Sequence, residues 1–287
     1  MQYHVLLFYK FVTLLDPEAI TRWQKTLCAS LNLKGRIIVA KEGINGTVEG
    51  TVDNIKKYIK ETRSYPLFTD IKFKKSVGTG TAFPRLSVKH RDEIVTLGLP
   101  KNERWDCAVF TGKFLTAEEL HNWIHNQKKE FYIVDLRNNY EHQVGHFKGS
   151  ILPNLNNFRY LSKILPTLTY LKDKTIVTVC TGGIRCEKAT GFLLKHGFTD
   201  VWQLKDGIVT YMQKYPNEDF EGKLYVFDNR YVIGFNVEDE KHKIIGRCLF
   251  TGQPCENYVD FLDPKTSKRV HGIVSKEAIK QGLVVLD

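Results

Sequence analysis

The sequence predicts an α/β protein with a ferredoxin-like α+β sandwich, then an α/β domain built on a parallel sheet, then a short irregular C-terminal region. Residues 1–95 show the order β-α-β-β-α-β, which is typical of the ferredoxin-like sandwich. Residues 127–218 alternate buried strands with helices, which indicates a parallel sheet covered on both faces. A connector with one helix at 96–126 and a C-terminal extension at 219–287 complete the expected domain organisation.

The composition indicates a globular protein. A chain of 287 residues is long enough for two or three domains of roughly 100–200 residues each. Its hydrophobic fraction of 42% and aromatic fraction of 12% are sufficient for packed cores. The chain start lacks a signal-peptide pattern, no apolar run approaches the ~20 residues that span a bilayer, and six cysteines are too few for a disulfide scaffold. We therefore expect a cytoplasmic protein without a membrane partner.

The elements of the sandwich follow from short apolar runs and from helix-start signals. Asp16 and Pro17 mark a helix start, because aspartate caps free backbone N–H groups and proline suits the first helical position. Glu42–Gly46 is expected to turn, since glycine and asparagine tolerate positive φ. The other expected elements are strands at His4–Tyr9, Arg36–Ala40, Thr47–Val48 and Ile71–Lys75, and helices at Asp16–Leu31 and Val52–Arg63.

In the second domain, a capping box at Thr116–Glu119 begins a helix that runs through His125.

Parallel sheets bind ligands beyond the carboxyl ends of their strands. Asp135 and Cys180 each end a strand, so both are expected to face one crevice. The expected strands are Phe131–Asp135, Thr175–Cys180 and Asp200–Leu204, and the expected helices are Cys186–His196 and Gly207–Tyr215.

The most informative segment is the loop Cys180-Thr181-Gly182-Gly183-Ile184-Arg185, which joins a buried strand to a helix. Such a loop points its backbone N–H groups at a common centre, where the helix dipole adds positive potential. A thiolate is stabilised there, so the pKa of Cys180 should be lowered and its reactivity raised. The glycines permit the curl, and Arg185 is expected to close it by binding loop carbonyls or an anionic substrate. Cys180 and Arg185 are therefore the predicted catalytic residues.

The spacing of this loop favours sulfur chemistry over phosphate chemistry. Four residues separate Cys180 from Arg185, whereas phosphatase loops of this kind hold one residue more and fit a tetrahedral phosphate. The smaller cradle suits a single sulfur added to the cysteine, as a persulfide. The loop therefore resembles that of the rhodaneses and predicts a rhodanese-like α/β domain. The alternative, a buried cysteine in an ordinary turn, is disfavoured by the two glycines and the arginine.

Residues near the loop leave alternatives open. Cys186 either resolves a persulfide as a disulfide with Cys180 or is a small residue of the first helical turn, and the second is favoured. Asp135 and Arg137 either support the site by contacting substrate or form an ion pair that fixes the strand-to-helix turn. His146 is favoured as a packed histidine rather than as a general base.

Five segments between residues 41 and 230 stand in the order found in a more specific family. They are Lys41–Thr47, Asp135–Asn138, Gly145–Gly149, Cys180–Lys188 and Val226–Arg230. On these segments the chain resembles the bacterial tRNA uridine hydroxylases that carry a central rhodanese domain. The resemblance implies an oxygen-dependent enzyme that converts the wobble uridine of certain tRNAs to 5-hydroxyuridine, with Cys180 as the catalytic cysteine.

The chain departs from the family pattern in two places. Asn139 stands where many members have aspartate after the Arg-Asn pair. Members often carry a C-terminal cysteine cluster of metal-binding appearance, whereas here Cys248 and Cys255 remain. Four ligands would then require His242 or His271. Zinc is therefore not expected, and no metal-binding residue is predicted.

The sequence shows no centre for oxygen activation. Hydroxylation with oxygen normally uses a metal, a flavin or another redox centre. The chain has neither a clear 2-His-1-carboxylate pattern nor a Gly-x-Gly-x-x-Gly after a strand. No cofactor is identifiable, and molecular oxygen and an unknown electron donor are the expected co-substrates. We hypothesise that Cys180, as thiolate or persulfide, adds to C6 of uridine and makes C5 nucleophilic toward an oxidant.

A net charge of +10 favours an anionic partner, and tRNA in its anticodon region fits the resemblance better than DNA. The run Phe83–Arg91 interleaves basic and apolar residues as an edge strand does, or forms an ordinary solvated face. Phe158 and Arg159 either stack on an anticodon base or are a core ring beside a surface arginine, which is favoured. The RNA-binding candidates are Lys74, Arg85, Lys89, Arg91 and Arg159.

Three functions of different classes are compatible with these features. The first is the tRNA hydroxylase, and the second is a persulfide-forming sulfurtransferase that acts on a small thiol or a carrier. The third is a non-catalytic rhodanese-like binding module, which the intact Cys180 and Arg185 disfavour. The basic charge and the added N-terminal domain favour the first over the second, because a small-molecule sulfurtransferase needs neither.

Overall fold

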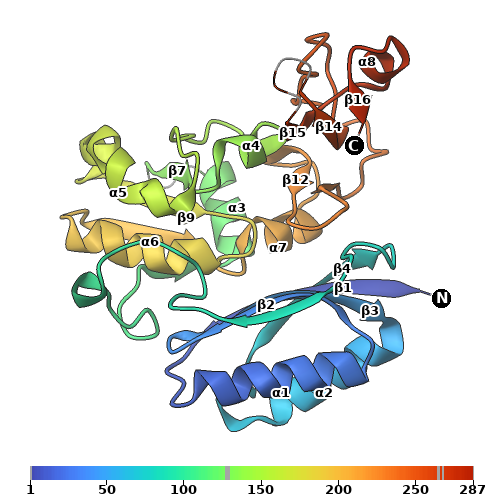
Figure 1. The fold of residues 1–287 in the computed structure, drawn as a ribbon. Coiled ribbons are helices and arrows are strands. Elements are labelled where there is room, and N and C mark those ends of the chain that lie inside the picture. The colour runs from blue at the N-terminus through green and yellow to red at the C-terminus, as the bar shows by residue number, and fades with distance from the viewer. Residues whose placement is uncertain (1, 127–129, 264–265, 267, 287) are drawn as a thin grey trace. The chain divides into compact units, whose positions relative to one another are not determined.

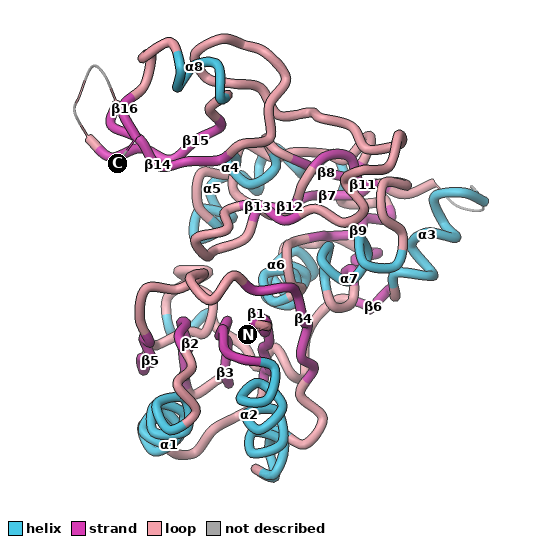
Figure 2. The backbone as a smooth tube through the Cα atoms, turned by 90° about the vertical axis from the view of Figure 1, so that its right-hand side faces the viewer, coloured by secondary structure: helices cyan, strands magenta, loops and turns pink. Residues whose placement is uncertain are grey.

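The computed structural model describes residues 2–126, 130–263, 266 and 268–286. The chain forms two compact units, one that ends at Thr111 and one that begins at Gly112. Figures 1 and 2 show the helices and strands of each unit. Among the described residues, no helix has the length and the apolar character to cross a membrane.

The first unit is the predicted ferredoxin-like sandwich with one added strand. Its five-stranded sheet has the order β4-β1-β3-β2-β5, in which β5 pairs in parallel with β2 and the other neighbours are antiparallel. Helices α1 and α2 cover one face of this sheet (Figure 1). The elements are β1 (Tyr3–Phe11), α1 (Pro17–Ser30), β2 (Lys34–Ala40), β3 (Gly43–Thr51), α2 (Val52–Ser64), β4 (Lys72–Gly78) and β5 (Leu86–His90), with short 3-10 turns at Pro66–Phe68 and Lys101–Glu103.

The expected helix start and edge strand are confirmed in this unit. The Asp16 carboxylate accepts the backbone N–H of Ala19 at 2.8 Å, and Pro17 is the first residue of α1. The core between sheet and helices includes Phe8, Ile37, Val48, Ile55 and Tyr58. The sheet alternates, so residues of β2 on either side of Ile37 point to the opposite face.

The predicted turn at Glu42–Gly46 is wrong, because β3 begins at Gly43 and runs through the segment. The glycines serve close packing inside the sheet. Gly43 has φ +139°, and a Cβ there would lie 2.0 Å from the Lys10 carbonyl oxygen. A Cβ on Gly46 would lie 2.4 Å from the ring of Phe8. Glycine is thus required at positions 43 and 46 because backbone and ring atoms of the neighbouring strand approach them closely. The glycines of this segment therefore reflect close packing more than a turn.

The second unit contains the predicted parallel sheet, with strand order β6-β10-β9-β7. Every residue of its strand β9 is buried. The capping box is confirmed, since Thr116 and Glu119 exchange backbone-to-side-chain hydrogen bonds of 2.7 and 3.2 Å. The elements are β6 (Lys113–Leu115), α3 (Ala117–Asn126), β7 (Tyr132–Asp135), α4 (Asn139–His142), β8 (Gly145–Phe147), α5 (Leu161–Ile164), β9 (Thr175–Val179), α6 (Ile184–Lys195), β10 (Asp200–Leu204), α7 (Gly207–Lys214) and β11 (Phe220–Gly222), with 3-10 turns at Phe158–Tyr160 and Leu165–Leu171.

The C-terminal region is more ordered than expected. It continues irregularly after β12 and β13 and then forms a three-stranded antiparallel sheet of order β15-β14-β16, beside which α8 lies (Figure 2). Tyr258, Phe261, Ile273 and Val284 belong to its buried cluster. The sequence did not predict this sheet because its strands are short and mixed with charged residues. The elements are β12 (Leu224–Tyr225), β13 (Val232–Ile233), β14 (Tyr258–Leu262), β15 (Arg269–Ile273), α8 (Lys276–Lys280) and β16 (Val285–Leu286).

Candidate active site

The predicted loop lies between the carboxyl end of β9 and the first turn of α6, with Cys180 buried at its start. Gly183 adopts φ +99° and donates its backbone N–H to the Cys180 sulfur at 3.2 Å. Burial alone would raise the pKa of Cys180. The thiol of Cys186, the charge of Arg185 and nearby backbone N–H groups lower that pKa to about 5. The direction of this shift favours the thiolate form of Cys180, which is the direction expected from the sequence.

Cys186 lies buried in the first turn of α6 and shares a hydrogen bond with Cys180. Burial and the neighbouring Cys180 thiolate raise the pKa of Cys186 well above its usual value. Cys186 therefore stays protonated and acts as the S–H donor of the pair. Neither cysteine forms a disulfide. The two sulfur atoms are in hydrogen-bond contact, and the resolving role of Cys186 stays a prediction.

Arg185 is bound by a carboxylate that was not predicted from the sequence. Its two terminal nitrogens donate to the Glu141 carboxylate at 2.6 and 2.7 Å, and one of them also contacts the Thr181 hydroxyl at 3.2 Å. Loop carbonyls or an anionic substrate were the expected partners, and the structure gives Glu141 and Thr181 instead. The signal was present as Asn138-x-x-Glu141, a capping box that begins α4 and fixes the glutamate in place.

Asp135 and Arg137 form the structural ion pair that was one of the two alternatives. Both side chains are fully buried, and the closest nitrogen–oxygen distance is 2.6 Å. Arg137 also donates to the Gly145 carbonyl at 2.7 Å, which ties β7 to β8. Burial would raise the pKa of Asp135, but the Arg137 guanidinium holds it below its usual value. The carboxylate that ends β7 is thus bound to Arg137 and supports the turn.

Helix α7 binds the loop through backbone hydrogen bonds. The backbone N–H of Ile208 donates to the Cys180 carbonyl at 3.0 Å, and that of Val209 donates to the Thr181 carbonyl at 3.1 Å. Gly207, at the start of α7, has φ +73°, and a Cβ there would lie 2.6 Å from backbone atoms of Gly182 and Gly183. The loop carbonyls are therefore directed toward α7, which leaves backbone N–H groups to face the thiolate.

Phe227 is an exposed aromatic residue beside the loop for which the sequence predicted no role. Its side chain is 45% exposed, and the Arg185 guanidinium carbon lies 5.7 Å from its ring centre. Tyr225 packs edge-on against the same ring at 5.4 Å. The buried pair of Asp228 and Arg230, 2.6 Å apart, fixes the turn that follows. The only signal in the sequence was the position of Phe227 within the segment Val226–Arg230.

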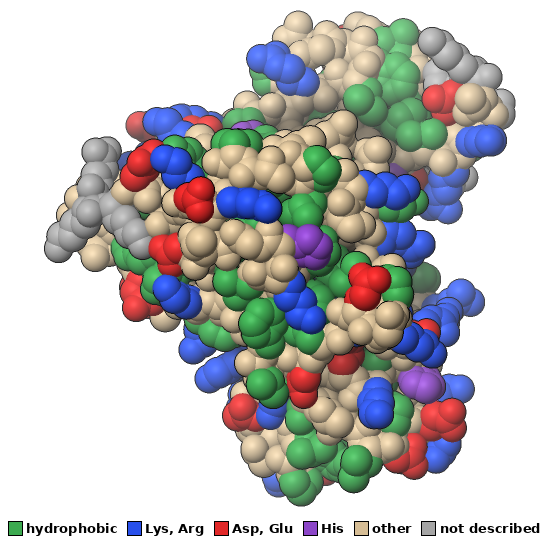
Figure 3. Space-filling view, turned by 90° about the vertical axis from the view of Figure 1, so that its left-hand side faces the viewer, with side chains coloured by type: hydrophobic (Ala, Val, Ile, Leu, Met, Phe, Trp, Pro, Cys, Tyr) green, Lys and Arg blue, Asp and Glu red, His purple; other side chains and the backbone are tan. Residues whose placement is uncertain are grey.

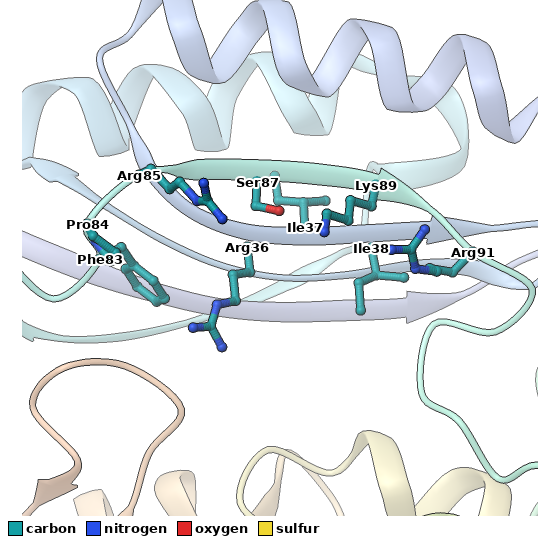
Figure 4. Close-up of a pocket in the computed structure, with 9 residues that line it drawn as sticks. All are labelled: Arg36, Ile37, Ile38, Phe83, Pro84, Arg85, Ser87, Lys89 and Arg91. Carbon is teal, nitrogen blue, oxygen red and sulfur yellow. The ribbon is translucent and has the colours of Figure 1, made fainter. Parts of the chain in front are cut away.

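A basic groove of about 390 Å³ lies on the first unit, along β2 and β5. Four cations, Arg36, Arg85, Lys89 and Arg91, line it, and Arg36 and Phe83 point away from the helices (Figure 4). Figure 3 shows one face of the molecule, on which Lys and Arg side chains are mixed with Asp and Glu. The other residues that line the groove are Ile37, Ile38, Pro84 and Ser87.

The predicted RNA-binding residues thus divide into two sets. Arg85, Lys89 and Arg91 meet in the groove, together with Arg36, which was not predicted because a fully buried strand was expected there. Lys74 does not line the groove, since it is 8% exposed and its ammonium lies 4.8 Å from the ring centre of Tyr9. Arg159 lies in the second unit beside the buried Phe158, which agrees with the favoured alternative.

The four C-terminal candidates for metal ligands each have another hydrogen-bond partner. The Cys248 sulfur accepts the N–H of Ser275 at 3.2 Å. Backbone and side-chain groups lower the pKa of Cys248 to about 6, although burial would raise it. Within the described ranges, these four side chains form no common ligand set. The remaining contacts are Cys255 with the Asn257 N–H at 3.3 Å, His242 with Glu256 at 2.9 Å and His271 with Asp260 at 2.8 Å.

Three family models match successive parts of the chain. The "UPF0176 acylphosphatase like domain" matches residues 3–94. The "Rhodanese-like domain" matches residues 116–214, which contain the Cys180 loop. The "Rhodanase C-terminal" model matches residues 221–272. These matches agree with the predicted sandwich and with the predicted rhodanese-like domain.

Relatives that match almost the whole chain are named tRNA uridine(34) hydroxylase. The chain is 45% identical over 272 residues to the tRNA uridine(34) hydroxylase of Bacillus licheniformis, across 94% of this chain and 83% of the relative. It is 42% identical to the tRNA uridine(34) hydroxylase of Staphylococcus carnosus, across 96% and 86% of the two chains. The protein of that name from Enterococcus faecalis is also 42% identical, across 94% and 84%. The chain belongs to the tRNA uridine(34) hydroxylase family.

Proposed function

We propose that this protein hydroxylates uridine 34 in the anticodon of tRNA, and that the Cys180 thiolate activates the base by adding to C6. The lowered pKa of Cys180, to about 5, carries the proposal, because it supplies a nucleophile at neutral pH. The Gly183 N–H and the Cys186 thiol stabilise the thiolate before addition and after elimination. Membership of the family supplies the substrate and the overall reaction.

The proposed step conserves atoms and electrons. The thiolate forms a bond to C6 as the C5–C6 double bond breaks, and the electron pair moves to C5 and the C4 carbonyl oxygen. Molecular oxygen is the oxidant, and one of its atoms is bonded to C5 while the other leaves as water with two electrons from an external reductant and two protons. Loss of the C5 proton then restores the double bond and expels the Cys180 thiolate. The net change replaces C5–H by C5–OH.

Phe227 is suited to hold the base against the loop. An exposed ring next to a guanidinium offers a surface on which uracil stacks, and aromatic stacking is the common way to bind an unpaired RNA base. Arg185 is paired with Glu141 and therefore positions Phe227 and the loop rather than binding a phosphate.

The groove of Arg36, Arg85, Lys89 and Arg91 is suited to phosphates of the tRNA backbone. Four cations around one hollow give the positive potential that non-specific RNA affinity requires. Contacts of this kind position the nucleic acid, whereas the base is recognised elsewhere.

The test is complementation of a deletion strain, with 5-hydroxyuridine and its derivatives measured in total tRNA by mass spectrometry. The wild-type chain should restore the modification, and Cys180→Ala and Cys180→Ser should not. Cys255→Ala, a cysteine of the C-terminal cluster, is the matched control and should restore it. Normal modification with Cys180→Ala would overturn the proposal. Thiosulfate-to-cyanide sulfur transfer without modified tRNA would favour the sulfurtransferase alternative.

A further inference from the structure

A second group of chemically active side chains lies in the second unit, outside the Cys180 loop. It consists of His121 and His125 of α3 and of Asp219, which directly precedes β11. The histidines are four residues apart, so they project from the same face of the helix. One ligand atom from each of the three residues lies within 4.8 Å of the others.

The two distances from the carboxylate oxygen to the imidazole nitrogens are close to those around a small metal ion. Asp219 Oδ2 lies 3.0 Å from His121 Nδ1 and 3.3 Å from His125 Nε2, and the two histidine nitrogens lie within 4.8 Å of each other. A tetrahedral centre with metal–ligand bonds of about 2.0–2.1 Å separates neighbouring ligand atoms by about 3.3 Å. Small side-chain movements would therefore place the three atoms around one ion.

Surrounding residues hold the three ligands in place. The Tyr211 hydroxyl of α7 donates to Asp219 Oδ2 and lies 3.2 Å from His121 Nδ1. The ring of Tyr215 stacks on His121 with a centre-to-centre distance of 4.0 Å and an interplanar angle of 3°. The hydrogen bond to Asp219 and the stacking on His121 orient these two side chains, as outer contacts do in metal sites, whereas the Tyr211 contact with His121 Nδ1 must give way when that nitrogen binds an ion. Asp219 is 8% exposed, so its carboxylate is largely removed from water.

One member of the group, Asp219, also borders a cavity. Asp219 lines a hollow of about 520 Å³ whose other walls include Trp123, Phe131, Phe147 and Lys148. His121 and His125 retain 26% and 48% exposure of their side chains, so an ion can enter from solvent. An ion held by three protein ligands keeps positions for water or a small ligand, as metal ions in catalytic sites do.

We propose that His121, His125 and Asp219 bind one divalent transition-metal ion, of which Zn²⁺ and Co²⁺ are the appropriate probes. Two imidazole nitrogens and one carboxylate oxygen favour this class over Mg²⁺ or Ca²⁺, which prefer oxygen ligands. The spacing His-x-x-x-His on a helix is a known way to present two nitrogens to zinc. The proposal does not depend on the reaction at Cys180.

Cobalt spectroscopy on the full chain tests the proposal and excludes the thiols as ligands. After chelation and dialysis, Co²⁺ titration should give visible d–d bands that saturate at one equivalent, without a thiolate-to-cobalt charge-transfer band. Zn²⁺ should displace the cobalt and raise the melting temperature as its concentration increases, because it binds the folded state. His125→Gln, at the most exposed ligand, should weaken binding at least tenfold without changing the circular dichroism spectrum.

Two further variants locate the site. Asp219→Asn keeps the size of the side chain and an oxygen that can accept from Tyr211, and it should also weaken Co²⁺ binding at least tenfold. His90→Gln, a half-exposed histidine of the first unit, is the matched control and should bind as the wild type does. Saturation accompanied by a thiolate band, equal affinity of His125→Gln and wild type, or absence of binding at millimolar Co²⁺ would each overturn the proposal.

Discussion

Arg185 and Glu141 form a bidentate ion pair in which the side chains are 8% and 0% exposed. The pair joins the first turn of α6 to α4 and therefore closes the Cys180 loop from the side. Burial would lower the pKa of Arg185, but Glu141 raises it, so the arginine remains charged. The positive charge beside the thiolate thus depends on a carboxylate from another helix.

Glu141→Gln should strongly destabilise the second unit. The substitution leaves a buried guanidinium without its counter-charge, and breaking a buried pair in this way costs about 3–5 kcal/mol. Urea unfolding followed by circular dichroism measures the loss. Glu118→Gln is the matched control, because its partner Lys214 is exposed and such pairs contribute about 0–1 kcal/mol. Equal losses for both variants would contradict the structural role of Glu141.

Cys186→Ala should raise the pKa of Cys180. The wild-type thiolate persists at neutral pH and is protonated as the pH falls through about 5, although burial opposes the thiolate. Removing the S–H donor moves this midpoint upward, whereas Cys186→Ser keeps a donor and should move it less. The measurement is the ultraviolet absorbance of the thiolate as a function of pH. The absorbance of the Cys180→Ala variant is subtracted, because the Cys248 thiolate contributes to the signal as well. An unchanged midpoint in Cys186→Ala would assign the low pKa to other groups.

Removing cations from the groove should lower both tRNA affinity and its salt dependence. The double variant Arg36→Ala/Lys89→Ala deletes two predicted phosphate-binding side chains. Each phosphate that is no longer neutralised reduces the slope of log K against log salt by about 0.7–0.9. Lys56→Ala/Lys57→Ala removes the same charge from the exposed side of α2 and should leave the slope nearly unchanged. Similar slopes for the two double variants would mean that net charge, not the groove, governs binding.

Gly207→Ala should disturb the active loop, whereas Gly149→Ala should not. Both glycines have positive φ, +73° and +70°, so either alanine incurs about 1–2 kcal/mol of backbone strain. Only at Gly207 would the new Cβ meet backbone atoms of the loop, at 2.6 Å, since nothing lies within 4 Å at Gly149. The Gly207 variant should therefore lose hydroxylation and raise the pKa of Cys180. Parallel melting curves and tRNA modification assays compare the two.

Phe227→Ala should lower kcat/KM for tRNA. Loss of one base–aromatic stack costs about 1–3 kcal/mol, and the exposed ring contributes little to folding. Phe227→Tyr preserves the stacking surface and should retain most of the activity. Kinetics at one salt concentration, with melting temperatures as a stability check, distinguish the two variants. An alanine variant with full activity would exclude Phe227 as the platform for uridine.

Features that depend on neighbours in sequence were predictable. The cap at Asp16, the box at Thr116–Glu119 and the loop from Cys180 to Arg185 each follow from residue types at fixed short spacing, and each is present. Helices with apolar periodicity and strands rich in β-branched residues were located within a few residues of their ends.

Features that depend on distant residues were not predictable. Glu141 meets Arg185 across 44 positions, and Asp219 meets His121 across 98. Neither pair leaves a periodic pattern, because the interaction arises only when the elements pack. Gly43 and Gly46 suggested a turn because a glycine that is needed for backbone flexibility looks the same in a sequence as one that is needed for close packing. The structure shows close packing at both positions. The domain limits at 95 and 126 stay predictions.

Strand β5 pairs with β2 alone among the described strands, so one of its edges offers unsatisfied backbone groups to any other extended chain. Such edges are sites of intermolecular strand addition, and charged residues are the usual protection. Arg85, Lys89 and Arg91 stand on or beside this edge. The same three cations that suit the groove to RNA therefore also oppose aggregation. A variant that lacks all three would bind tRNA more weakly and would be less soluble.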